Sequence, residues 1–325
     1  MYDIVTIGDV FEDVFLRPKD TYFKNSQIRV FKDKLCLEHG AKILVEEIDF
    51  DLGGSACNVA VGLKKFGYNT ALISALGNDE RGQRIKNKLY LTGIDTKYIK
   101  QFSKINSNFS SIIVYKKERT VLLYRGLKDY SQLKIPKNLS TRWVYLGPVS
   151  EEFSENYKYL INLAAEKNIN IAINPGHRQI LKEKQKLKNL IRVCKILILN
   201  KKEALDLTGL PPFTSIKKIL STLKIYGSDI VALTDGRNGA FITDGEKFIG
   251  CDILPTESID PTGAGDAFSS GFIASYIKAG DLSKALNFGI INSGIVTEDY
   301  GAQRNLQTES QVRRLISKLP NIYNL

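Results

Sequence analysis

The sequence predicts an α/β protein with a mainly parallel sheet that is covered by helices on both faces. Two observations lead to this fold class. Short apolar, strand-like runs alternate with amphipathic helical stretches along most of the chain, and Gly67, Gly93 and Gly209 follow helical stretches where C-terminal glycines are expected. Strands that alternate with helices favour parallel pairing, because each crossover helix packs on a face of the sheet.

The individual elements follow from apolar runs and helical periodicity. The predicted strands are Ile4–Ile7, Ala71–Leu76, Trp143–Leu146, Ile169–Ile173, Ile196–Leu199 and Ile230–Leu233. The predicted helices between them are Ser55–Phe66, Gly82–Leu91, Glu152–Glu166, Glu203–Thr208 and Ser215–Ile225. A helical C-terminal part is predicted at Ala264–Ala279, Leu282–Thr297 and Ser310–Lys318. Since no repeat or long linker interrupts the pattern, we expect residues 1–325 to form a single domain.

Two stretches depart from this alternation, Phe11–Asp51 and Ser103–Tyr124, and they predict a small separate sheet. Their β-like pieces are Ala41–Val45, Ser111–Tyr115 and Thr120–Tyr124, the last two as a hairpin around Lys116–Arg119. We expect about residues 12–51 and 103–126 to form a lid over the functional site. A lid excludes water, which would otherwise compete as a nucleophile.

Composition narrows the class of protein. The 325 residues are 43% hydrophobic and 25% charged, as in ordinary globular proteins, and no apolar run is long enough for a transmembrane helix. The net charge of +11 comes from dispersed lysines, and the dense run Lys182–Lys188 is best interpreted as a solvated helix face. We therefore expect neither a nucleic-acid nor a membrane partner. The four cysteines are widely spaced and no signal peptide is visible, which favours the cytoplasm.

The stretch Asp260–Asp266, with the sequence DPTGAGD, is the most informative part of the chain. Gly263 and Gly265 have no Cβ, so the backbone can turn tightly and bring N–H groups close to an anion. The helix expected from Ala264 adds the positive end of its dipole. An aspartate at such a site is repelled by the anion, and removing a proton from a hydroxyl nucleophile is a reason to place Asp266 there.

Two further motifs suggest contacts with a hydroxylated ligand. Gly53 and Gly54 precede a helix and allow close approach to the backbone, while Asn58 offers both donors and an acceptor. A tight turn with Asn58 bonded to the backbone is an equally good interpretation. Asp13 lies in the acidic stretch after the first strand, at the edge where ligands bind in parallel sheets. Its alternative is a solvated turn.

Two motifs suggest a nucleotide and its metal. Asn200 and Glu203 stand three residues apart at a helix start and can hold water around Mg²⁺. The same pair is a natural helix cap, which is the better interpretation of these two residues alone. Thr234–Gly239 joins the β-like runs Ile230–Leu233 and Ala240–Thr243 as a glycine-containing hairpin. If this turn has a binding function, its backbone lies along a nucleotide.

The order and spacing of these motifs resemble the ribokinase-like (PfkB) family of carbohydrate kinases over nearly the whole chain. The helix entry at 53–58 and the segment 260–273 correspond to the family's two signature regions, with the Asn-x-x-Glu and Thr-x-Gly-x-x-Gly motifs between them. The resemblance implies a three-layer α/β/α sandwich with a mainly parallel central sheet and a small β-sheet lid. It also implies ATP- and Mg²⁺-dependent phosphorylation of a hydroxyl on a small sugar or sugar-like substrate.

The resemblance implies roles for individual residues as well. Asp266 corresponds to the general base, and the matching anion hole is Gly263, Ala264 and Gly265. The implied nucleotide contacts are Asn200, Glu203, Thr234, Asp235, Gly236, Arg237, Asn238, Gly239 and Asn292. The implied substrate contacts are Asp13, Gly53, Gly54 and Asn58. Asn200 and Glu203 correspond to residues that organise Mg²⁺ through water, and Asp260 corresponds to a ligand of a monovalent cation such as K⁺ in many members.

One departure from the family pattern affects the substrate. Ribokinase-type members often carry an acidic residue after the strand that corresponds to Trp143–Leu146, and here that strand runs into Gly147 and Pro148. Ribose is therefore not specifically implied, and a nucleoside kinase is the main alternative within the family. A catalytically silent relative that only binds a sugar or nucleotide is an alternative of another class. The open edges of the lid sheet are compatible with a homodimer.

Overall fold

The computed structural model describes residues 1–24, 27–32, 34–115, 118–127, 130–149, 153–319 and 321–325. Within these residues, ten strands form one sheet. In spatial order they are β16 (Tyr323–Asn324), β15 (Phe248–Cys251), β14 (Ala240–Thr243), β13 (Ile230–Thr234), β12 (Ile196–Asn200), β11 (Asn170–Ile173), β10 (Thr141–Leu146), β1 (Tyr2–Ile7), β6 (Thr70–Gly77) and β7 (Ile99–Phe102). Neighbouring strands from β13 to β7 run parallel, and β14 to β16 add an antiparallel edge. The predicted mainly parallel sheet is confirmed.

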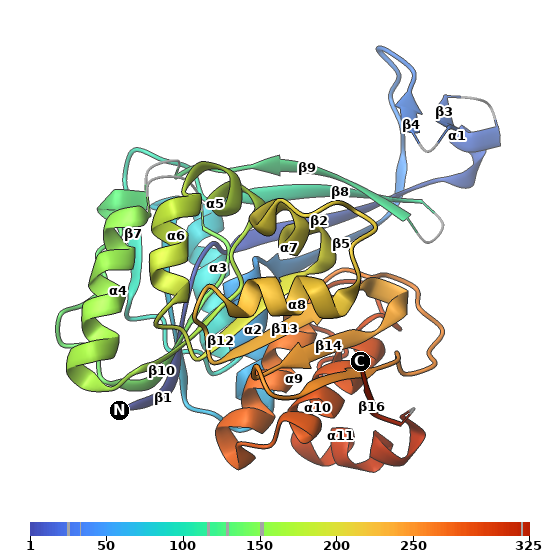
Figure 1. Cartoon of the computed structure of the whole chain (residues 1–325). Helices are drawn as coiled ribbons and strands as arrows, with labels where there is room; N and C mark the ends of the chain where they lie inside the picture. The colour runs from blue at the N-terminus through green and yellow to red at the C-terminus, as the bar shows by residue number, and fades with distance from the viewer. Residues whose placement is uncertain (25–26, 33, 116–117, 128–129, 150–152, 320) are drawn as a thin grey trace.

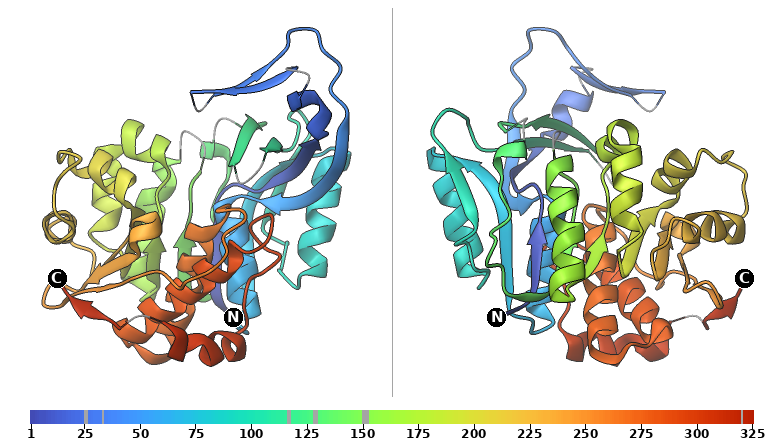
Figure 2. Two further views of the ribbon diagram at one scale, coloured as in Figure 1. Left: turned by 90° about the vertical axis from the view of Figure 1, so that its right-hand side faces the viewer. Right: turned by 60° about the vertical axis from the view of Figure 1, so that its left-hand side comes forward.

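Helices cover both faces of this sheet, as Figure 2 shows. One face carries α2 (Ser55–Lys65), α3 (Glu80–Leu91), α9 (Ala264–Ala279), α10 (Leu282–Val296) and α11 (Glu309–Leu315). The other face carries α4 (Ser154–Lys167), α5 (His177–Lys182), α6 (Lys184–Ile191), α7 (Lys201–Thr208) and α8 (Ile216–Lys224). The result is the three-layer α/β/α arrangement that the sequence predicts.

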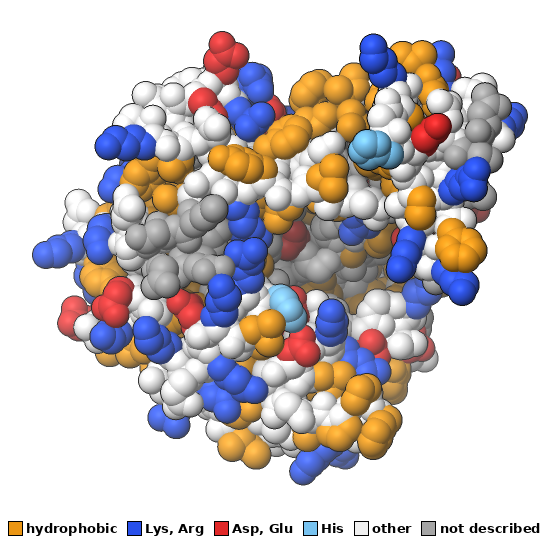
Figure 3. All heavy atoms as spheres, turned by 90° about the horizontal axis from the view of Figure 1, so that it is seen from above, with side chains coloured by type: hydrophobic (Ala, Val, Ile, Leu, Met, Phe, Trp, Pro, Cys, Tyr) orange, Lys and Arg blue, Asp and Glu red, His pale blue; other side chains and the backbone are white. Residues whose placement is uncertain are grey.

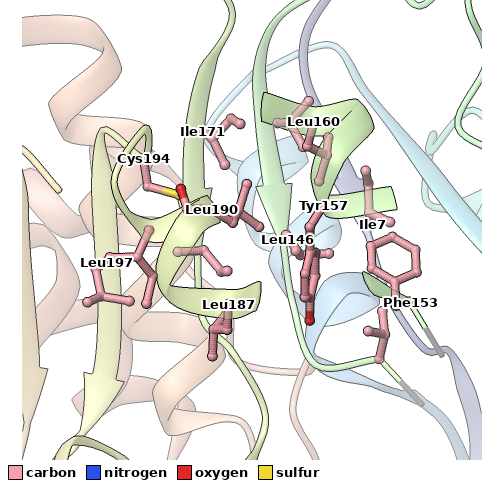
Figure 4. Packing of buried hydrophobic residues seen from close by; sticks show 14 of the residues in the cluster. Ile7, Leu146, Phe153, Tyr157, Leu160, Ile171, Leu187, Leu190, Cys194 and Leu197 are labelled. Atoms are coloured by element: carbon pink, nitrogen blue, oxygen red, sulfur yellow. The ribbon is translucent and has the colours of Figure 1, made fainter. Parts of the chain in front are cut away.

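The strands are apolar along their whole length because both of their faces are buried. In β1, Val5 and Ile7 belong to one core cluster and Ile4 to the other, since successive side chains point to opposite faces. Figure 4 shows the first cluster, in which Leu187 and Leu190 from α6 pack beside the strands. Among the described residues, no helix combines the length and the hydropathy needed to cross a membrane.

Helix boundaries follow local capping chemistry. The side chains of Asp79, Ser215 and Asp281 accept hydrogen bonds from backbone N–H groups three residues later and so begin α3, α8 and α10. Gly209 ends α7 in the left-handed conformation, with a φ of 78°. These positions explain why several helix ends could be located from the sequence.

The chain reverses its direction of travel across the sheet beside β1. From β1 it moves to β6 and β7 on one side, and then returns to β10 on the other side. Crossovers that diverge in this way leave a crevice at the carboxyl ends of the two strands between them, here β1 and β10. Gly8 and Gly147 follow these ends, and a Cβ on Gly8 would lie 2.7 Å from the Cβ of Ala56 in α2. Helix α2 therefore begins directly over this crevice.

A second sheet lies over the carboxyl ends of the central strands (Figure 1). We call it the second sheet; its order is β5 (Val45–Gly53), β2 (Phe11–Pro18), β8 (Phe109–Tyr115) and β9 (Glu118–Tyr124). Helix α1 (Asp20–Lys24) and the hairpin of β3 (Ile28–Phe31) and β4 (Lys34–Leu37) project from it. Short 3₁₀ turns lie at Tyr130–Gln132, Gly236–Asn238 and Ile316–Lys318.

Several predicted elements differ from the structure. Residues 41–44 are not a strand; β5 begins at Val45 and continues to Gly53, so the prediction of Ala41–Val45 is wrong for four of its five residues. Strand β2 was not predicted, because its acidic residues hide any alternation. The run from 182 to 188 is split between α5 and α6 at Glu183. The predicted helix start at Glu152 and the first half of the hairpin turn at 116–117 lie outside the described residues.

Candidate active site

The predicted site residues come from strand ends and helix starts that meet at the crevice. The N-terminus of α9 faces the N-terminus of α2, and β10 lies beside them through Tyr145. Beyond β11, Asn200 and Thr234 are register partners at the ends of the adjacent strands β12 and β13. Figure 3 looks onto this end of the molecule and shows it hollowed at the centre, with charged side chains around the rim.

Asp266 lies in the first turn of α9 and is held by two donors from α2. Ser55 Oγ donates to Asp266 Oδ1 at 2.5 Å, and Asn58 Nδ2 donates to Asp266 Oδ2 at 2.8 Å. The Tyr145 hydroxyl contacts Ser55 Oγ at 3.2 Å. Burial raises the pKa of the Asp266 carboxyl, and the two hydrogen bonds oppose that rise. A carboxylate with a raised pKa that is fixed in a crevice is suited to accept a proton.

Asn58 is itself oriented by a residue from a distant segment. Gln303 Nε2 donates to Asn58 Oδ1 at 2.8 Å, which directs the amide donor of Asn58 toward Asp266. Gln303 also donates to the carbonyl of Leu52 at 3.1 Å and is buried. Asn58 was predicted as a site residue, whereas Ser55 and Gln303 were not. Ser55 stood inside the glycine motif, whereas Gln303 carried no motif signal.

The loop before α9 has a shape that only glycine permits at one position. Gly263 has a φ of 77°, and a Cβ there would lie 2.4 Å from the Cβ of Ala302. Gly265 instead faces open space, with no heavy atom within 4 Å of where its Cβ would be. The first N–H groups of a helix have no partner inside the helix. An anion at Gly265 therefore fits both the free space and the helix dipole.

Asn200 and Glu203 form the helix cap that the sequence analysis weighed against a metal role. Glu203 N donates to Asn200 Oδ1 at 2.9 Å, and Asn200 N donates to Glu203 Oε2 at 3.0 Å. Burial raises the pKa of the Glu203 carboxyl, and the nearby charge of Asp266 raises it further. Asn174 is a further hydrogen-bond partner of the Glu203 carboxylate, and carboxylate oxygens are ligands that suit Mg²⁺.

The turn predicted to contact the nucleotide is exposed at its tip and hydrogen-bonded across its base. It joins β13 to β14 as predicted, with Asp235 N donating to Gly239 O at 2.9 Å. Lys201 Nζ lies 3.0 Å from Asp235 Oδ2 and ties the turn to α7. Gly239 has a φ of 89°, and a Cβ there would lie 2.2 Å from the carbonyl oxygen of Cys251. Gly236, Arg237 and Asn238 at the tip of this turn are exposed, whereas Gly239 is buried.

The second sheet contributes two buried carboxylates that lie side by side, and one of them, Asp51, pairs with Lys88 of α3 at 2.8 Å. Asp13 in β2 and Asp51 in β5 are register partners and both are buried. Burial, opposed by a hydrogen bond with Ser110 and reinforced by the charge of Asp51, raises the pKa of Asp13 to about 6. A Cβ on Gly53 would lie 2.0 Å from Asp13 Oδ2, so a larger residue there would displace the Asp13 carboxylate. A Cβ on Gly54 would lie 2.3 Å from the carbonyl oxygen of Asp9.

The other two acidic residues between β1 and Asp13, namely Asp9 and Glu12, have arginine partners. Asp9, after β1, pairs with Arg125, which follows β9 of the second sheet. Glu12 pairs with Arg84 at 2.8 Å and Arg81 at 3.2 Å on α3, and the hydrogen bond with Arg84 holds the pKa of the Glu12 carboxyl below its usual value. Successive residues of β2 point to opposite faces, so Glu12 and Asp13 diverge.

Two predicted residues have partners that limit their contact with a ligand. Asn292 is 0% exposed; its amide donates to the carbonyl of Ala267 at 2.8 Å and accepts from Gln307 N at 3.0 Å. It joins α10 to α9, and no atom of its side chain is left for a nucleotide. Asp260 is 5% exposed and contacts Arg119 of β9 at 3.1 Å.

Comparison with known proteins identifies the family to which this site belongs. A family model described as pfkB family carbohydrate kinase matches residues 25–309. The chain belongs to the pfkB family. It is therefore a kinase, a phosphotransferase of the carbohydrate class. The matched residues include β5, β8 and β9 of the second sheet, the glycine entry of α2 and the loop before α9, whereas β2 precedes them.

Relatives of this pfkB kinase act on different acceptors. It is 30% identical over 82% of its length to a nucleoside kinase of Methanocaldococcus jannaschii, covering 85% of that protein. It is 27% identical over 93% of its length to an ATP-dependent 6-phosphofructokinase of Thermoanaerobacterium thermosaccharolyticum, covering 89% of that protein. The structure of Arabidopsis thaliana ribokinase complexed with ribose and ATP superposes with a TM-score of 0.77 at 19% identity, over 97% of this chain and 98% of that chain. This likeness confirms the ribokinase fold.

Proposed function

We propose that this protein transfers the γ-phosphate of ATP to a hydroxyl of a small sugar or sugar-like molecule, with Mg²⁺ as the metal and Asp266 as the general base. The observation that carries the proposal is the position of Asp266. Its carboxylate is bonded to Ser55 and Asn58 at the entry of α2, and it lies one residue after Gly265, which faces open space at the start of a helix.

The reaction balances with these residues in their roles. The acceptor oxygen attacks the γ-phosphorus, the new O–P bond forms as the bridging O–P bond to ADP breaks, and the hydroxyl proton passes to Asp266. Charge that develops on the transferred group is stabilised by N–H groups around Gly265 and by the dipole of α9. Because phosphoryl transfer needs little covalent chemistry from the protein, positioning supplies most of the acceleration.

ATP and Mg²⁺ are assigned to the other side of the crevice. We propose that the adenosine part lies along the turn Thr234–Gly239 and that the phosphates extend toward Gly265. Asn200 stands beside Thr234, the first residue of the turn, at the ends of adjacent strands. Glu203, whose charge lies near Asp266, would hold Mg²⁺ through water. The metal supplies neutralisation of charge on the phosphates.

The acceptor is assigned to the side of the second sheet. Asp13 is a buried carboxylate beside the glycine entry, and a buried carboxylate that faces a crevice is a strong acceptor for sugar hydroxyls. Gly53 and Gly54 let the ligand approach the backbone, and Asn58 lies next to Asp266. We propose that the second sheet, from about residues 12–51 and 103–126, is a lid within one domain of residues 1–325.

A nucleoside is a second candidate acceptor, and one observation favours it. Val121 and Leu123 alternate with Arg119 along β9, so all three side chains point to the face of the second sheet that looks toward Asp260. Val121 is 44% exposed and Leu123 is 51% exposed. An apolar pair over a hydroxyl-binding crevice suits a ligand with a planar apolar part as well as a sugar ring.

We also propose a homodimer that forms through the outer face of the second sheet. Phe50, Val14 and Leu122 lie in one row across it, and Phe50 and Leu122 are 56% and 59% exposed. A monomeric sedimentation coefficient at micromolar concentration would reject this proposal. We place the protein in the cytoplasm, because none of its four cysteines forms a disulfide. Fractionation of cells tests that placement.

The proposed activity is tested by ADP release with a panel of acceptors that includes sugars, sugar phosphates and nucleosides. We expect ATP-dependent turnover with one of these classes and its abolition by EDTA. Turnover that favours nucleosides would select the second candidate. Binding of ATP or of an acceptor without turnover across the panel would instead identify a catalytically silent relative.

A further inference from the structure

We propose that Arg119 on the second sheet supplies the positive charge that the family resemblance assigns to a monovalent cation at Asp260. In this way the chain itself would hold the phosphate-binding loop, the segment from Asp260 to Gly265 before α9, in its active shape. Arg119 is a positioning residue in this proposal, since it contacts Asp260 and not the reacting atoms. The inference rests on the proposed kinase function and adds a regulatory consequence, which is independence from K⁺.

The contacts of Asp260 carry the proposal. Arg119 Nη1 lies 3.1 Å from Asp260 Oδ1, and the backbone N and hydroxyl of Thr262 donate to the same oxygen at 2.9 Å and 2.5 Å. Gly301 N donates to the other oxygen, Oδ2, at 3.0 Å. Both oxygens of this buried carboxylate are thus engaged. A monovalent cation does not fit at Oδ1 unless Arg119 leaves.

The charge balance at this position also depends on Arg119. Among the described residues, the guanidinium of Arg119 is the cationic group that forms a salt bridge with Asp260. A buried carboxylate without a counter-charge is strongly unfavourable, because burial removes its hydration. The side chain of Arg119 is 29% exposed and that of Asp260 is 7% exposed. The pair therefore lies, largely shielded from solvent, at the junction between the second sheet and the body, by which we mean the central ten-stranded sheet with the helices that cover it.

Asp260 connects this charge to the phosphate-binding loop. It precedes Gly263 by three residues and Asp266 by six residues. Its Oδ2 fixes Gly301, and the next residue, Ala302, packs against Gly263, whose Cβ would lie 2.4 Å from the Cβ of Ala302. A displaced Asp260 would therefore disturb the backbone around Gly263 as well as Gly301 and Ala302, which lie against it. Since catalysis depends on geometry within a fraction of an ångström, such a disturbance slows transfer.

The same junction has a second contact that serves as a matched control. The guanidinium of Arg17 in β2 lies 4.2 Å from the centre of the Tyr300 ring. Tyr300 packs beneath the second sheet against Phe15, Ile112 and Val114. Loss of Arg17 weakens the attachment of the sheet to the body, as loss of Arg119 does, but it leaves Asp260 with its arginine. The two variants therefore separate attachment from charge compensation.

The experiment compares wild type, Arg119→Ala and Arg17→Ala in KCl and in tetramethylammonium chloride at equal ionic strength. We expect wild-type kcat to be the same in both salts. In tetramethylammonium chloride, Arg119→Ala should lose about tenfold or more in kcat, and KCl should restore most of it, because K⁺ can occupy the vacated position beside Asp260. Arg17→Ala should respond equally to the two salts.

Thermal unfolding gives a readout that does not depend on turnover. We expect KCl to raise the Tm of Arg119→Ala by about 3 °C or more over tetramethylammonium chloride, with no difference for wild type or Arg17→Ala. A wild type that needs K⁺ for activity or stability would overturn the proposal, as would an Arg119→Ala variant that shows no specific response to K⁺. A failure of the proposed function would appear separately, as a wild type without turnover across the acceptor panel.

Discussion

The central sheet and the second sheet show how differently the two sides of this site are held. Strands β1, β10 and β12 are buried on both faces, so the residues at their carboxyl ends have nearly fixed positions. The second sheet buries one face in part, and on its other face Ile48 and Phe50 are 55% and 56% exposed. Ion pairs at its edge, such as Arg304 Nη2 with Asp49 Oδ1 at 3.1 Å, attach it to the body.

This difference indicates a division of labour. A region that is packed on both faces suits the phosphoryl-transfer groups, which need fixed geometry. A region with little buried apolar surface opens at low cost in free energy, so it suits a lid that admits and selects an acceptor. Changes in the body should therefore alter kcat for every acceptor, and changes in the second sheet should alter the choice of acceptor.

The largest effect is expected for Asp266→Asn in the body. Loss of the base should lower kcat by about 10³-fold for every acceptor, because the hydroxyl proton has no acceptor of suitable strength. The pH–rate profile of wild type should fall as pH decreases through the raised pKa of Asp266, since the protonated carboxyl cannot accept a proton. This acid limb should be absent from the residual activity of the variant.

The control for Asp266→Asn is retention of structure and nucleotide binding. Asparagine keeps the size of the side chain and can still bond to Ser55 or Asn58, so Tm and the Kd for ATP should change little. If the variant turned over within about tenfold of wild type, Asp266 would not be the base.

A smaller effect is expected for Glu203→Gln, which separates the metal role from the cap. Glutamine can still accept from Asn200 N, so α7 should remain capped and Tm should change little. Loss of the charge should raise the Mg²⁺ concentration needed for half-maximal rate by about tenfold for every acceptor. An unchanged dependence on Mg²⁺ would leave Asn200 and Glu203 as a helix cap only. Titration of activity with MgCl₂ at saturating ATP is the measurement.

The smallest effect on rate is expected for Asp13→Asn in the second sheet. We expect KM for the acceptor to rise about tenfold with little change in kcat or in KM for ATP. An equal loss for all acceptors through kcat, with KM unchanged, would break the proposed division of labour. The measurement is steady-state kinetics of wild type and variant, in which kcat and KM are compared for two acceptors with the same arrangement of hydroxyl groups.

Asp13→Asn should also change stability with a definite sign. The pKa of Asp13 is raised to about 6 in the folded protein, so the folded state binds the proton more tightly and wild type loses stability as pH rises through that value. At about pH 8 the variant should be more stable than wild type by about 2 kcal/mol, and below about pH 4 the difference should vanish. Urea unfolding at both pH values measures it.

Glu12→Gln is the matched control on the same strand. Arg84 and Arg81 lower the pKa of Glu12, so this carboxylate stabilises the folded state above its ordinary pKa, and that stability is lost as pH falls. The variant should be less stable than wild type at about pH 8, with KM for the acceptor unchanged. Opposite signs of stability for adjacent residues would confirm that Asp13 faces the crevice and Glu12 faces α3.

The sequence alone was sufficient where local rules decide the structure. The parallel sheet followed from apolar runs between helices, because a strand buried on both faces must be apolar. The glycine entry at Gly54 and the loop at Gly263 were located because their positive φ angles and close contacts leave room for glycine only. Their assignment to substrate and phosphate stays a prediction until the variants are measured.

Only the tertiary structure decided which distant residues complete the site. Gln303 contacts Asn58 across 245 residues, and Arg119 contacts Asp260 across 141 residues. Nothing in the sequence near Gln303 or Arg119 indicates these partners, because such contacts depend on how the second sheet and the segment after α10 pack on the body. The sequence therefore determined Asp266 and its loop, and the packing decided what orients the carboxylate and balances the charge beside it.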